Sequence, residues 1–358
     1  MTTLSVRPTP LDPAAIRTTV EQLLHGFLDE QERATPDLPE LKLFTGQLRD
    51  MIAAGGKRIR PVLCVTGWHT ITDQDPPPAV WRVAASLELF HAFALIHDDI
   101  MDNSDTRRGR PTAHRALATH HTGRPDADRL GVNAAILLGD LALGWSYELL
   151  HTPDITPRQL ALVWPLLNAL RTETLAGQYL DLTATGHLTA DPDTPWRVIR
   201  YKTTKYTIER PLHLGATLAG ASAGQLDALT AYALPLGEAF QLRDDLLGVW
   251  GDPAQTGKSA LDDLREGKHT VLAATALARA TVVEQCTLRR LYGHPQLAAA
   301  DAEQVRTVLT GTGARAATEQ MITDKRDQAL GAVDTTHLLP AGLALLRHFA
   351  RAATTRTT

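Results

Sequence analysis

The chain is 358 residues long with a formal net charge of −4, so its charge balance gives no sign of a nucleic-acid-binding surface. Its two cysteines, Cys64 and Cys286, lie far apart in apolar surroundings, which argues against a disulfide framework or a zinc site and predicts a cytoplasmic protein. The first residues lack the pattern of a secretory signal, and no apolar run approaches the roughly 20 residues of a membrane-spanning helix. We therefore expect no stable membrane insertion.

Ala and Leu dominate the sequence and β-branched runs are few, which favours helices over strands. Short turn signals such as Gly55-Gly56 separate the helical patterns, and no internal repeat or low-complexity linker interrupts them. We predict a single all-α domain at residues 14–352. A loose tail is expected at residues 1–13, and a polar tail at residues 353–358.

The first motif in chain order follows the turn at Gly55-Gly56 with the basic residues Lys57 and Arg60. Glycine lets backbone N–H groups approach an anion closely, while Lys and Arg supply positive charge. The pattern differs from a P-loop, and a single lysine of this kind is usually a solvated charge. Alone, the motif is weak support for a phosphate site.

The next segment, about residues 83–105, is an apolar helix that ends in carboxylates. At about 100° per residue, a helical wheel puts five of its residues on one face: Leu87, His91, Ala94, Asp98 and Asp102. Carboxylates at a helix C-terminus oppose the helix dipole unless a cation offsets them. The segment therefore predicts a metal site.

Asp98 and Asp102 lie one turn apart, so both can reach the same hard cation. Mg²⁺ prefers oxygen ligands and typically bridges one or two carboxylates to substrate phosphates. The alternative is an exposed acidic helix end surrounded by water. The context weakens that alternative, because an apolar run precedes the aspartates and Arg107-Arg108 follows them.

A second apolar helix, predicted for about residues 228–250, ends in Asp244-Asp245. It is the weaker half of the pattern, because Gly248 stands where a third aspartate would repeat the first motif. Further carboxylates and basic residues follow it: Asp252, Lys258, Asp262, Asp263 and Lys268. Two helices built in this way can face each other across one cavity.

Two aspartate clusters and dispersed basic residues in an apolar helical protein indicate a ligand with a diphosphate at one end and an apolar chain at the other. Metals and basic groups can neutralise a departing diphosphate. An apolar cavity that excludes water would then protect a carbocation from quenching.

Together these motifs resemble the trans-type polyprenyl diphosphate synthases, the family of farnesyl and geranylgeranyl diphosphate synthases. The resemblance covers roughly residues 42–269 and includes the family's motifs in the family's order. These are Gly-Gly-Lys-Arg-Ile-Arg-Pro, His-Asp-Asp-Ile-Met-Asp with Arg-Arg-Gly-Arg-Pro-Thr, Gly177-Gln178-x-x-Asp181, Lys202-Thr203, Phe240-Gln241-x-x-Asp244-Asp245 and Gly257-Lys258. Any one could occur by chance, but the ordered set is highly specific.

The resemblance implies a helical bundle around a central cavity, the isoprenoid synthase fold. It also implies a Mg²⁺-dependent prenyltransferase that condenses isopentenyl diphosphate head to tail with an allylic diphosphate. In that reading, three Mg²⁺ ions are held by Asp98, Asp102 and Asp244, assisted by Asp99, Asp245 and Asp263. The allylic diphosphate is gripped by Arg107, Lys202 and Lys258. Isopentenyl diphosphate is bound by Gly56, Lys57, Arg60, His91 and Arg108. The allylic carbocation lies beside Thr203 and Gln241.

A lone histidine on an apolar helix is usually a satisfied core residue, so the role of His91 depends on the resemblance, and His97 and His114 are predicted to be structural. Gly248 departs from the family pattern. In the family the last aspartate of the second motif contributes less directly than the first, so we expect activity to survive.

Product length in the family depends on side-chain bulk one turn before the first aspartates. Here small Ala94 leaves space, and Phe93 could form a partial floor, although the helical wheel puts only Ala94 on the cavity face. There is no two-residue insertion between Asp98 and Asp102, which the bacterial farnesyl type usually has. Geranylgeranyl diphosphate (C20) is the expected product, with farnesyl diphosphate (C15) second.

Three other functions would be compatible with parts of this pattern. A terpene cyclase would not need an isopentenyl pocket, and the Gly-Gly-Lys-x-x-Arg motif argues against it. A non-catalytic partner subunit commonly loses the first aspartate motif, which this chain keeps. A structural bundle with incidental acidic ends would not carry the ordered motifs. The resemblance further implies a homodimer.

Overall fold

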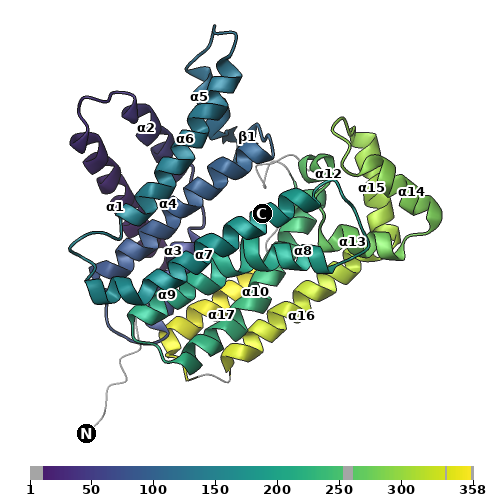
Figure 1. Cartoon of the computed structure of the whole chain (residues 1–358). Helices are drawn as coiled ribbons and strands as arrows, with labels where there is room; N and C mark the ends of the chain where they lie inside the picture. Colours follow the sequence, from purple (N-terminus) through teal and green to yellow (C-terminus); the bar gives the residue numbers. More distant parts are fainter. Residues whose placement is uncertain (1–10, 253–260, 335–336, 356–358) are drawn as a thin grey trace.

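The computed structural model describes residues 11–252, 261–334 and 337–355. Within these ranges the regular secondary structure consists of helices and one short hairpin, which confirms the predicted all-α class (Figure 1). The helices in the first part are α1 (Pro13–Ala34), α2 (Leu41–Ala53), α3 (Ile59–His69), α4 (Pro78–Met101), α5 (Ala113–Thr119), α6 (Ala127–Glu148), α7 (Pro157–Ala184), α8 (Asp193–Val198), the π-helix η1 (Ile199–Glu209), α9 (Arg210–Leu218) and α10 (Ala223–Trp250). Those in the second part are α12 (Asp262–Glu266), α13 (Val271–Arg279), α14 (Val282–Leu291), α15 (Ala299–Gly311), α16 (Ala314–Asp334) and α17 (Pro340–Thr355). The hairpin strands are β1 (Thr106–Arg107) and β2 (Arg110–Pro111).

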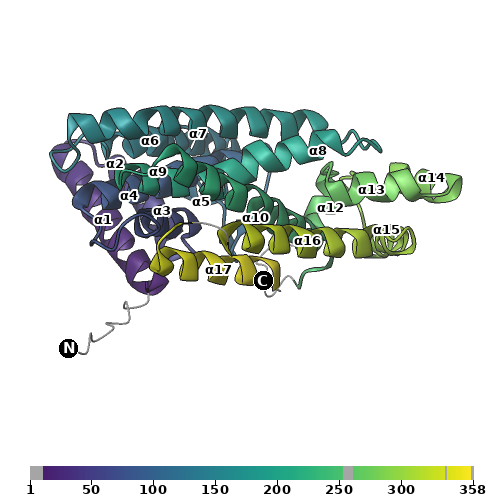
Figure 2. The same ribbon diagram turned by 90° about the horizontal axis from the view of Figure 1, so that it is seen from below.

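The helices stack in an order that leaves α10 and η1 inside the molecule. α7 packs on η1, η1 packs on α10, and α10 packs on α16. Figure 2 shows the same order from below, with α7 and α8 on one side and α16 and α17 on the other. The two helices that the sequence predicts to carry aspartates, α4 and α10, are therefore both central elements with extensive buried surface.

The starts of several long helices follow from their sequences. The side chains of Thr156 and Ser222 accept hydrogen bonds from the backbone N–H groups of Gln159 and Gln225, respectively. The side chains of the two glutamines in turn accept hydrogen bonds from the backbone N–H groups of Thr156 and Ser222. These capping boxes satisfy N–H groups that would otherwise lack partners. They define where α7 and α10 begin.

The apolar core divides into three clusters. One joins α1, α3, α4, α6 and α7, a second joins the later half of α10 to α13–α16, and a third joins α3, α9, the earlier half of α10, α16 and α17. α10 contributes Leu242 and Leu246 to the second cluster and Leu229 and Leu236 to the third. This helix therefore links the aspartate-bearing end to the rest of the core.

α3 and α9 approach until their backbones touch. A Cβ atom added to Gly215 of α9 would lie 1.8 Å from the backbone oxygen of Cys64, and one added to Gly67 of α3 would lie 2.2 Å from that of Leu212. Such distances leave no room for any side chain. The contact sets the position of α3, whose start carries Arg60, against the helix that follows η1.

The ordered helices extend slightly beyond the predicted domain of residues 14–352. α1 begins at Pro13, inside the predicted tail, because Asp12 caps it and proline suits the first helical position. α17 continues to Thr355, and buried Thr354 donates a hydrogen bond to the Ala350 carbonyl. The helices therefore begin one residue before the predicted domain and end three residues after it.

Among the described residues, α4 and α6 are long and apolar enough to cross a membrane by length and composition alone. The sequence reading missed them because single polar residues interrupt each apolar run while the average hydropathy stays high. α4 is mostly buried, as the core helix of a globular protein would be. α6 is less buried and exposes Ile136 and Leu137.

Candidate active site

The two aspartate-bearing helix ends face one cavity of about 540 Å³, as the sequence predicted. α4 ends at Met101 with Asp102 as its cap, and α10 contributes Asp244 and Asp245 from its last turns. Basic residues from several separate segments line the same cavity: Lys57, Arg58, Arg60, Arg107, Arg108, Lys202 and Lys268. The cavity therefore brings together carboxylates and cations from segments far apart in the sequence.

The face of α4 that lines the cavity differs from the predicted one at three positions. Its lining residues are Glu88, His91, Leu95 and Asp98. Leu87, Ala94 and Asp102, which the helical wheel put on this face, are absent from that set. Leu87 is buried in the core, and Asp102 pairs with Lys268. A wheel drawn from the apolar pattern could not have chosen Glu88, because a buried carboxylate is unexpected on such a stripe.

The residues assigned to product length lie beside the cavity lining. Phe93 is buried and its ring packs edge-on against Phe90 and His97. Ala94 is partly buried against the core cluster that includes α4. The predicted structural role of His97 agrees with this aromatic packing.

A tight hairpin aims two arginines in different directions. Arg108 and Gly109, between β1 and β2, both have positive φ (53° and 72°), which is the backbone of a type I′ turn. Arg107 on one strand turns toward α4, whereas the Arg108 guanidinium donates a hydrogen bond to the Gly55 carbonyl. The hairpin thus joins the Gly-Gly-Lys motif to the first aspartate motif.

Asp98 lies at the centre of the cations. It accepts hydrogen bonds from Lys202 at 3.1 Å, from Gln178 at 3.1 Å and from Arg107 at 3.3 Å. Burial opposes its ionisation, but Lys202, Lys268 and Arg107 outweigh burial and hold the pKa of Asp98 well below its usual range. Asp98 is therefore a carboxylate at any physiological pH.

Asp99 and Asp102 have separate partners. Asp99 is only 2% exposed and receives the Nε–H of Arg107 at 2.8 Å, so it orients that arginine and does not line the cavity. Asp102 accepts a hydrogen bond from Lys268 at 3.2 Å. Burial, together with the nearby charge of Asp98, raises the pKa of Asp102 despite Lys268. A further cation near this carboxylate would favour its ionised form.

Lys202 and Thr203 lie on the π-helix η1, which no sequence pattern predicted. Lys202 and Thr207 both line the cavity. In an α-helix two residues five apart lie about 140° from each other, whereas i→i+5 hydrogen bonding brings them close to alignment. π-Helical segments are rare and occur mostly at functional sites.

The partners of Lys202 include a residue from α7. Lys202 donates a hydrogen bond to Asp181 at 2.6 Å as well as to Asp98. α7 can come this close because Gly177 faces the η1 backbone, where a Cβ atom would lie 2.4 Å from the Lys202 nitrogen. The Gly177-Gln178-x-x-Asp181 motif therefore serves to bring α7 against η1 and to position Lys202.

A hydrogen-bonded chain connects η1 to the second aspartate pair. The Thr203 hydroxyl donates a hydrogen bond to the side-chain oxygen of Gln241 (Oε1) at 2.8 Å. The side-chain nitrogen of Gln241 (Nε2) donates one to Asp245 at 2.9 Å. Burial raises the pKa of Asp245 to about 8, an effect that the hydrogen bond from Gln241 opposes only in part. Gln241 and Asp245 line the cavity, while Thr203 lines a smaller space behind it.

His91 is fixed by Tyr206, a residue that the sequence reading missed. Its Nδ1 lies 2.8 Å from the Tyr206 hydroxyl, and the Arg60 guanidinium lies 4.0 Å from the centre of the Tyr206 ring. Burial, with Arg60 and Arg108 nearby, lowers the pKa of His91 well below its usual range. His91 is therefore a neutral hydrogen-bonding group among the basic residues.

Glu88 was also missed. It is 6% exposed and accepts a hydrogen bond from Arg58 at 2.6 Å, while its second oxygen is buried without a partner. It lines the cavity next to Arg60 and Arg108. The buried Glu88 carboxylate offsets part of the positive charge of the neighbouring arginines when no anion is bound.

The carboxylates are suited to a cation shared with a ligand. In the described part of the chain, no three His, Cys, Asp or Glu side chains are grouped so that they could hold a metal by themselves. Instead Asp98 lies on one wall and Asp244 and Asp245 on another. Mg²⁺ is commonly held in this way, by one or two carboxylates on each side and by phosphate oxygens of the substrate. Lys258, also predicted to bind phosphate, lies outside the described residues.

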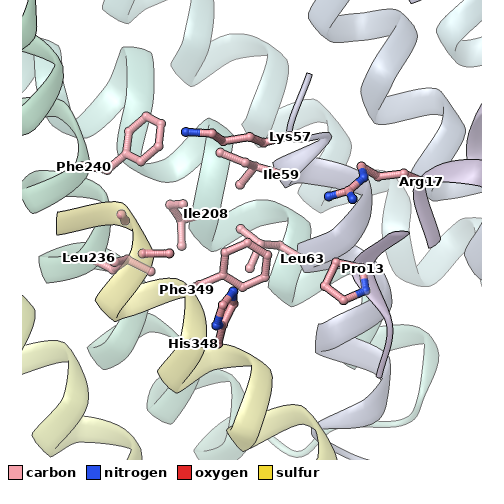
Figure 3. Close-up of a pocket in the computed structure, with 12 residues that line it drawn as sticks. Pro13, Arg17, Lys57, Ile59, Leu63, Ile208, Leu236, Phe240, His348 and Phe349 are labelled. Carbon is pink, nitrogen blue, oxygen red and sulfur yellow. The ribbon is translucent and has the colours of Figure 1, made fainter. Parts of the chain in front are cut away.

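A second cavity, of about 340 Å³, adjoins the first (Figure 3). Lys57, Ile59 and Phe240 line both cavities. The far wall of the second cavity is made by α17, with His348 and Phe349 facing into it. α17 therefore does not line the main cavity itself. It lines the adjoining cavity, on the other side of the residues that the two cavities share.

Comparisons with known proteins agree with this geometry. The family model described as Polyprenyl synthetase matches residues 42–309. The chain is 36% identical to a farnesyl diphosphate synthase of Geobacillus stearothermophilus, over 73% of this chain and 86% of that protein. It is 32% identical to a short chain isoprenyl diphosphate synthase of Methanocaldococcus jannaschii, over 70% of each. A solved geranylgeranyl pyrophosphate synthase from Corynebacterium glutamicum, complexed with isoprenyl diphosphate and magnesium, superposes with a TM-score of 0.92 at 39% identity, over 97% of this chain and all of that one.

Proposed function

This chain belongs to the polyprenyl synthetase family and is a prenyltransferase of the short-chain isoprenyl diphosphate synthase type, and we propose that its product is geranylgeranyl diphosphate (C20), with farnesyl diphosphate (C15) second. The substrates we propose are isopentenyl diphosphate and an allylic diphosphate. The observation that carries the proposal is the single cavity in which Asp98 faces Asp244 and Asp245 among basic residues.

The two diphosphates would occupy different parts of this cavity. The allylic diphosphate would lie between the aspartate pairs, where Lys202 and Arg107 already pair with Asp98. Isopentenyl diphosphate would lie near Gly56, Lys57 and the neutral His91, with Arg60 and Arg108 supplying charge. In this arrangement the basic residues favour ligands that carry a diphosphate. The diphosphate bound between the aspartate pairs is the one that leaves, so its allylic chain becomes the electrophile.

We propose Mg²⁺, in three sites, as the cofactor that neutralises the departing diphosphate. Asp98 and Asp102 would hold it from α4, and Asp244 with Asp245 from α10. The chain's own groups do the rest. Asp181 would hold Lys202 on the leaving group, and Gln241 would present its side-chain oxygen beside the allylic carbon, with the Thr203 hydroxyl hydrogen-bonded to that oxygen from behind. The isopentenyl double bond then attacks, and the proton lost goes to the released diphosphate.

The direct test is to incubate the purified protein with isopentenyl diphosphate and each allylic primer, in Mg²⁺ or in EDTA. Dephosphorylated products are then sized by chromatography. A C20 alcohol formed only with Mg²⁺ is expected, and a C15 alcohol would support the second candidate. A cyclic hydrocarbon would instead favour a terpene cyclase, and no product with any primer would contradict catalysis by this chain alone.

We expect Ala94→Phe to shorten the product by at least one C5 unit. Ala94 lies one turn before Asp98, beside the aromatic contact of Phe93 with Phe90, so an added ring would extend that apolar barrier. Product sizing checks this, with Ala300→Phe, at an exposed position of α15, as the matched control. An unchanged product in both variants would remove Ala94 from the determination of chain length.

We further propose a homodimer, formed through α6 and α7, which run along the same edge of the molecule in Figure 2. These helices expose large apolar side chains, among them Leu137 (60% exposed) and Tyr179 (68%). A surface of this kind indicates a protein interface when its apolar groups are contiguous. The proposed assembly is cytoplasmic.

Leu137→Arg is expected to shift the protein from dimer to monomer, because it buries a charge in the proposed interface. Light scattering after size-exclusion chromatography measures the change. Val282→Arg is the matched control, since Val282 is 78% exposed on α14, away from this face. A dimer that persists in Leu137→Arg, or a loss in both variants, would contradict an interface through α6.

A further inference from the structure

The carboxylate of Asp102 lies behind a lysine. Lys268 lines the main cavity, whereas Asp102 does not, and the Lys268 ammonium lies 3.2 Å from Oδ2 of Asp102. The Asp102 side chain is only 11% exposed. Asp98, one turn earlier on α4, does line the cavity. A metal ion in the cavity can therefore bind Asp102 together with Asp98 only after the Lys268 ammonium has moved aside.

The backbone of Lys268 is held in a turn that the surrounding fold anchors. Its carbonyl accepts hydrogen bonds from the Tyr292 hydroxyl at 2.7 Å and from the Thr270 N–H at 3.0 Å. Gly267, just before it, has a φ of 69°, and a Cβ atom there would lie 2.6 Å from Cα of Gly293. The positive φ and the close approach both require glycine. Movement of the ammonium is therefore a movement of the side chain and not of the turn.

Glu266 gives the Lys268 ammonium a second carboxylate. Glu266 is the last residue of α12, and its Oε2 lies 3.0 Å from the Lys268 Nζ. The ammonium is thus shared between Asp102 and Glu266, and the flexible lysine stem lets it shift from one to the other. An unpaired charge in a largely buried position would be costly. Because Glu266 is adjacent, Lys268 can release Asp102 and still remain paired.

The charge balance of the cavity determines when this shift is favourable. Without a ligand, Mg²⁺ at Asp102 and the displaced ammonium would share one small group of carboxylates, and cations this close repel each other. A bound diphosphate adds negative charge to the same space and supplies phosphate oxygens, which Mg²⁺ commonly uses together with one or two carboxylates. Metal binding at Asp102 is therefore expected to be weak without a diphosphate and much stronger with one.

We propose that Lys268 is a resident counter-ion of Asp102 that Mg²⁺ displaces only when a diphosphate is bound, so that Lys268 couples metal binding to substrate binding. The inference depends on the proposed Mg²⁺-diphosphate chemistry and deepens it. Lys268 acts through Asp102 as a positioning residue, and Glu266 receives its ammonium during the exchange. A protein built in this way does not assemble its metal cluster in an empty cavity.

The test compares Mg²⁺ binding with and without a diphosphate. Mg²⁺ is titrated calorimetrically into the protein alone and into protein saturated with a thiolo analogue of dimethylallyl diphosphate, in which sulfur replaces the bridging oxygen and prevents reaction. Without the analogue, Lys268→Met is expected to raise the Mg²⁺ affinity roughly 10-fold or more, because a positive charge beside Asp102 is removed. With the analogue, wild type and variant are expected to agree within a few-fold, because the diphosphate then favours the displaced position of Lys268.

The same coupling can be measured from the side of the diphosphate. Because linkage is reciprocal, Mg²⁺ is expected to improve the affinity of the analogue roughly 10-fold less in Lys268→Met than in the wild type. Lys268→Gln is a second variant that removes the charge but keeps a hydrogen-bond donor, and it is expected to behave in the same way. Circular dichroism verifies that each variant is folded.

Lys325→Met is the matched control. Lys325 lies 2.6 Å from the buried carboxylate of Glu238, and neither residue lines the main cavity. This variant also takes a lysine away from a buried carboxylate, so it reproduces that cost without touching Asp102. It is expected to keep the wild-type Mg²⁺ affinity in both titrations.

The outcomes separate this inference from the function on which it depends. If wild-type protein binds no Mg²⁺ even with the analogue, the proposed metal chemistry fails, and the inference with it. If wild-type protein binds Mg²⁺ with the analogue, but Lys268→Met and Lys268→Gln bind it no more tightly without the analogue, the proposed function stands and the inference is overturned. A gain of equal size with and without the analogue would also overturn it, since Lys268 would then repel the metal without coupling it to the diphosphate.

Discussion

Asp98→Asn is expected to lower kcat by roughly 10²–10³-fold while leaving the fold intact, a loss comparable to removing one preorganised electrostatic contact from an active site. Asp98 is the carboxylate on which Lys202, Arg107 and Gln178 converge. Asparagine keeps the shape but removes the charge that organises these donors and would hold the metal. Steady-state kinetics with isopentenyl and allylic diphosphates, in saturating Mg²⁺, measure the effect.

The matched control for this variant is Asp105→Asn. Asp105 follows the same helix but its side chain is mostly exposed, and its ion pair, with Arg115, lies at the surface. Surface pairs of this kind contribute little, about 1 kcal/mol or less. Near-normal kcat in Asp98→Asn, or an equal loss in Asp105→Asn, would exclude the role assigned to Asp98.

Gly215→Val is expected to destabilise the protein by roughly 3 kcal/mol or more, at the upper end of the effects of overpacking. The added atoms would meet the backbone of α3 at Cys64, which cannot rotate away as a side chain could. α3 and α9 would have to separate. Urea denaturation followed by circular dichroism measures the change in the free energy of unfolding.

The same substitution at Gly26 is the control. Gly26 lies inside α1, and a Cβ atom there meets nothing within 4 Å. Because valine has a higher helix propensity than glycine, Gly26→Val should be neutral or slightly stabilising. Similar losses of stability in both variants would mean that the backbone contact between α3 and α9 is not what makes Gly215 necessary.

Much of the site could be predicted because its motifs are local in sequence. The two aspartate-bearing helices, their common cavity and most of its basic residues follow from short patterns and helical periodicity. The helical wheel for α4 put His91 and Asp98 correctly on the cavity face, whereas Leu87, Ala94 and Asp102 do not line the cavity. An ideal wheel has no information on how a helix is rotated against its neighbours, which depends on tertiary packing.

The residues that were missed depend on contacts between distant segments. Tyr206 reaches His91 across 115 positions of the chain. Glu88 resembles any helix glutamate until Arg58 is brought to it. None of these pairs leaves a spacing pattern in the sequence, so only the folded arrangement identifies them.

The π-helix η1 also determines how the length of this protein can change during evolution. Surface loops generally tolerate the gain or loss of a residue. Within Ile199–Glu209, loss of one residue between Lys202 and Thr207 would favour i→i+4 hydrogen bonding and leave these two residues four positions apart, about 40° from each other. Both would still face the same cavity, whereas the loss of one residue from an ordinary α-helix rotates the chain beyond the deletion by about 100°. The π-helix therefore allows the loss of one residue at a point in the core where an α-helix would not.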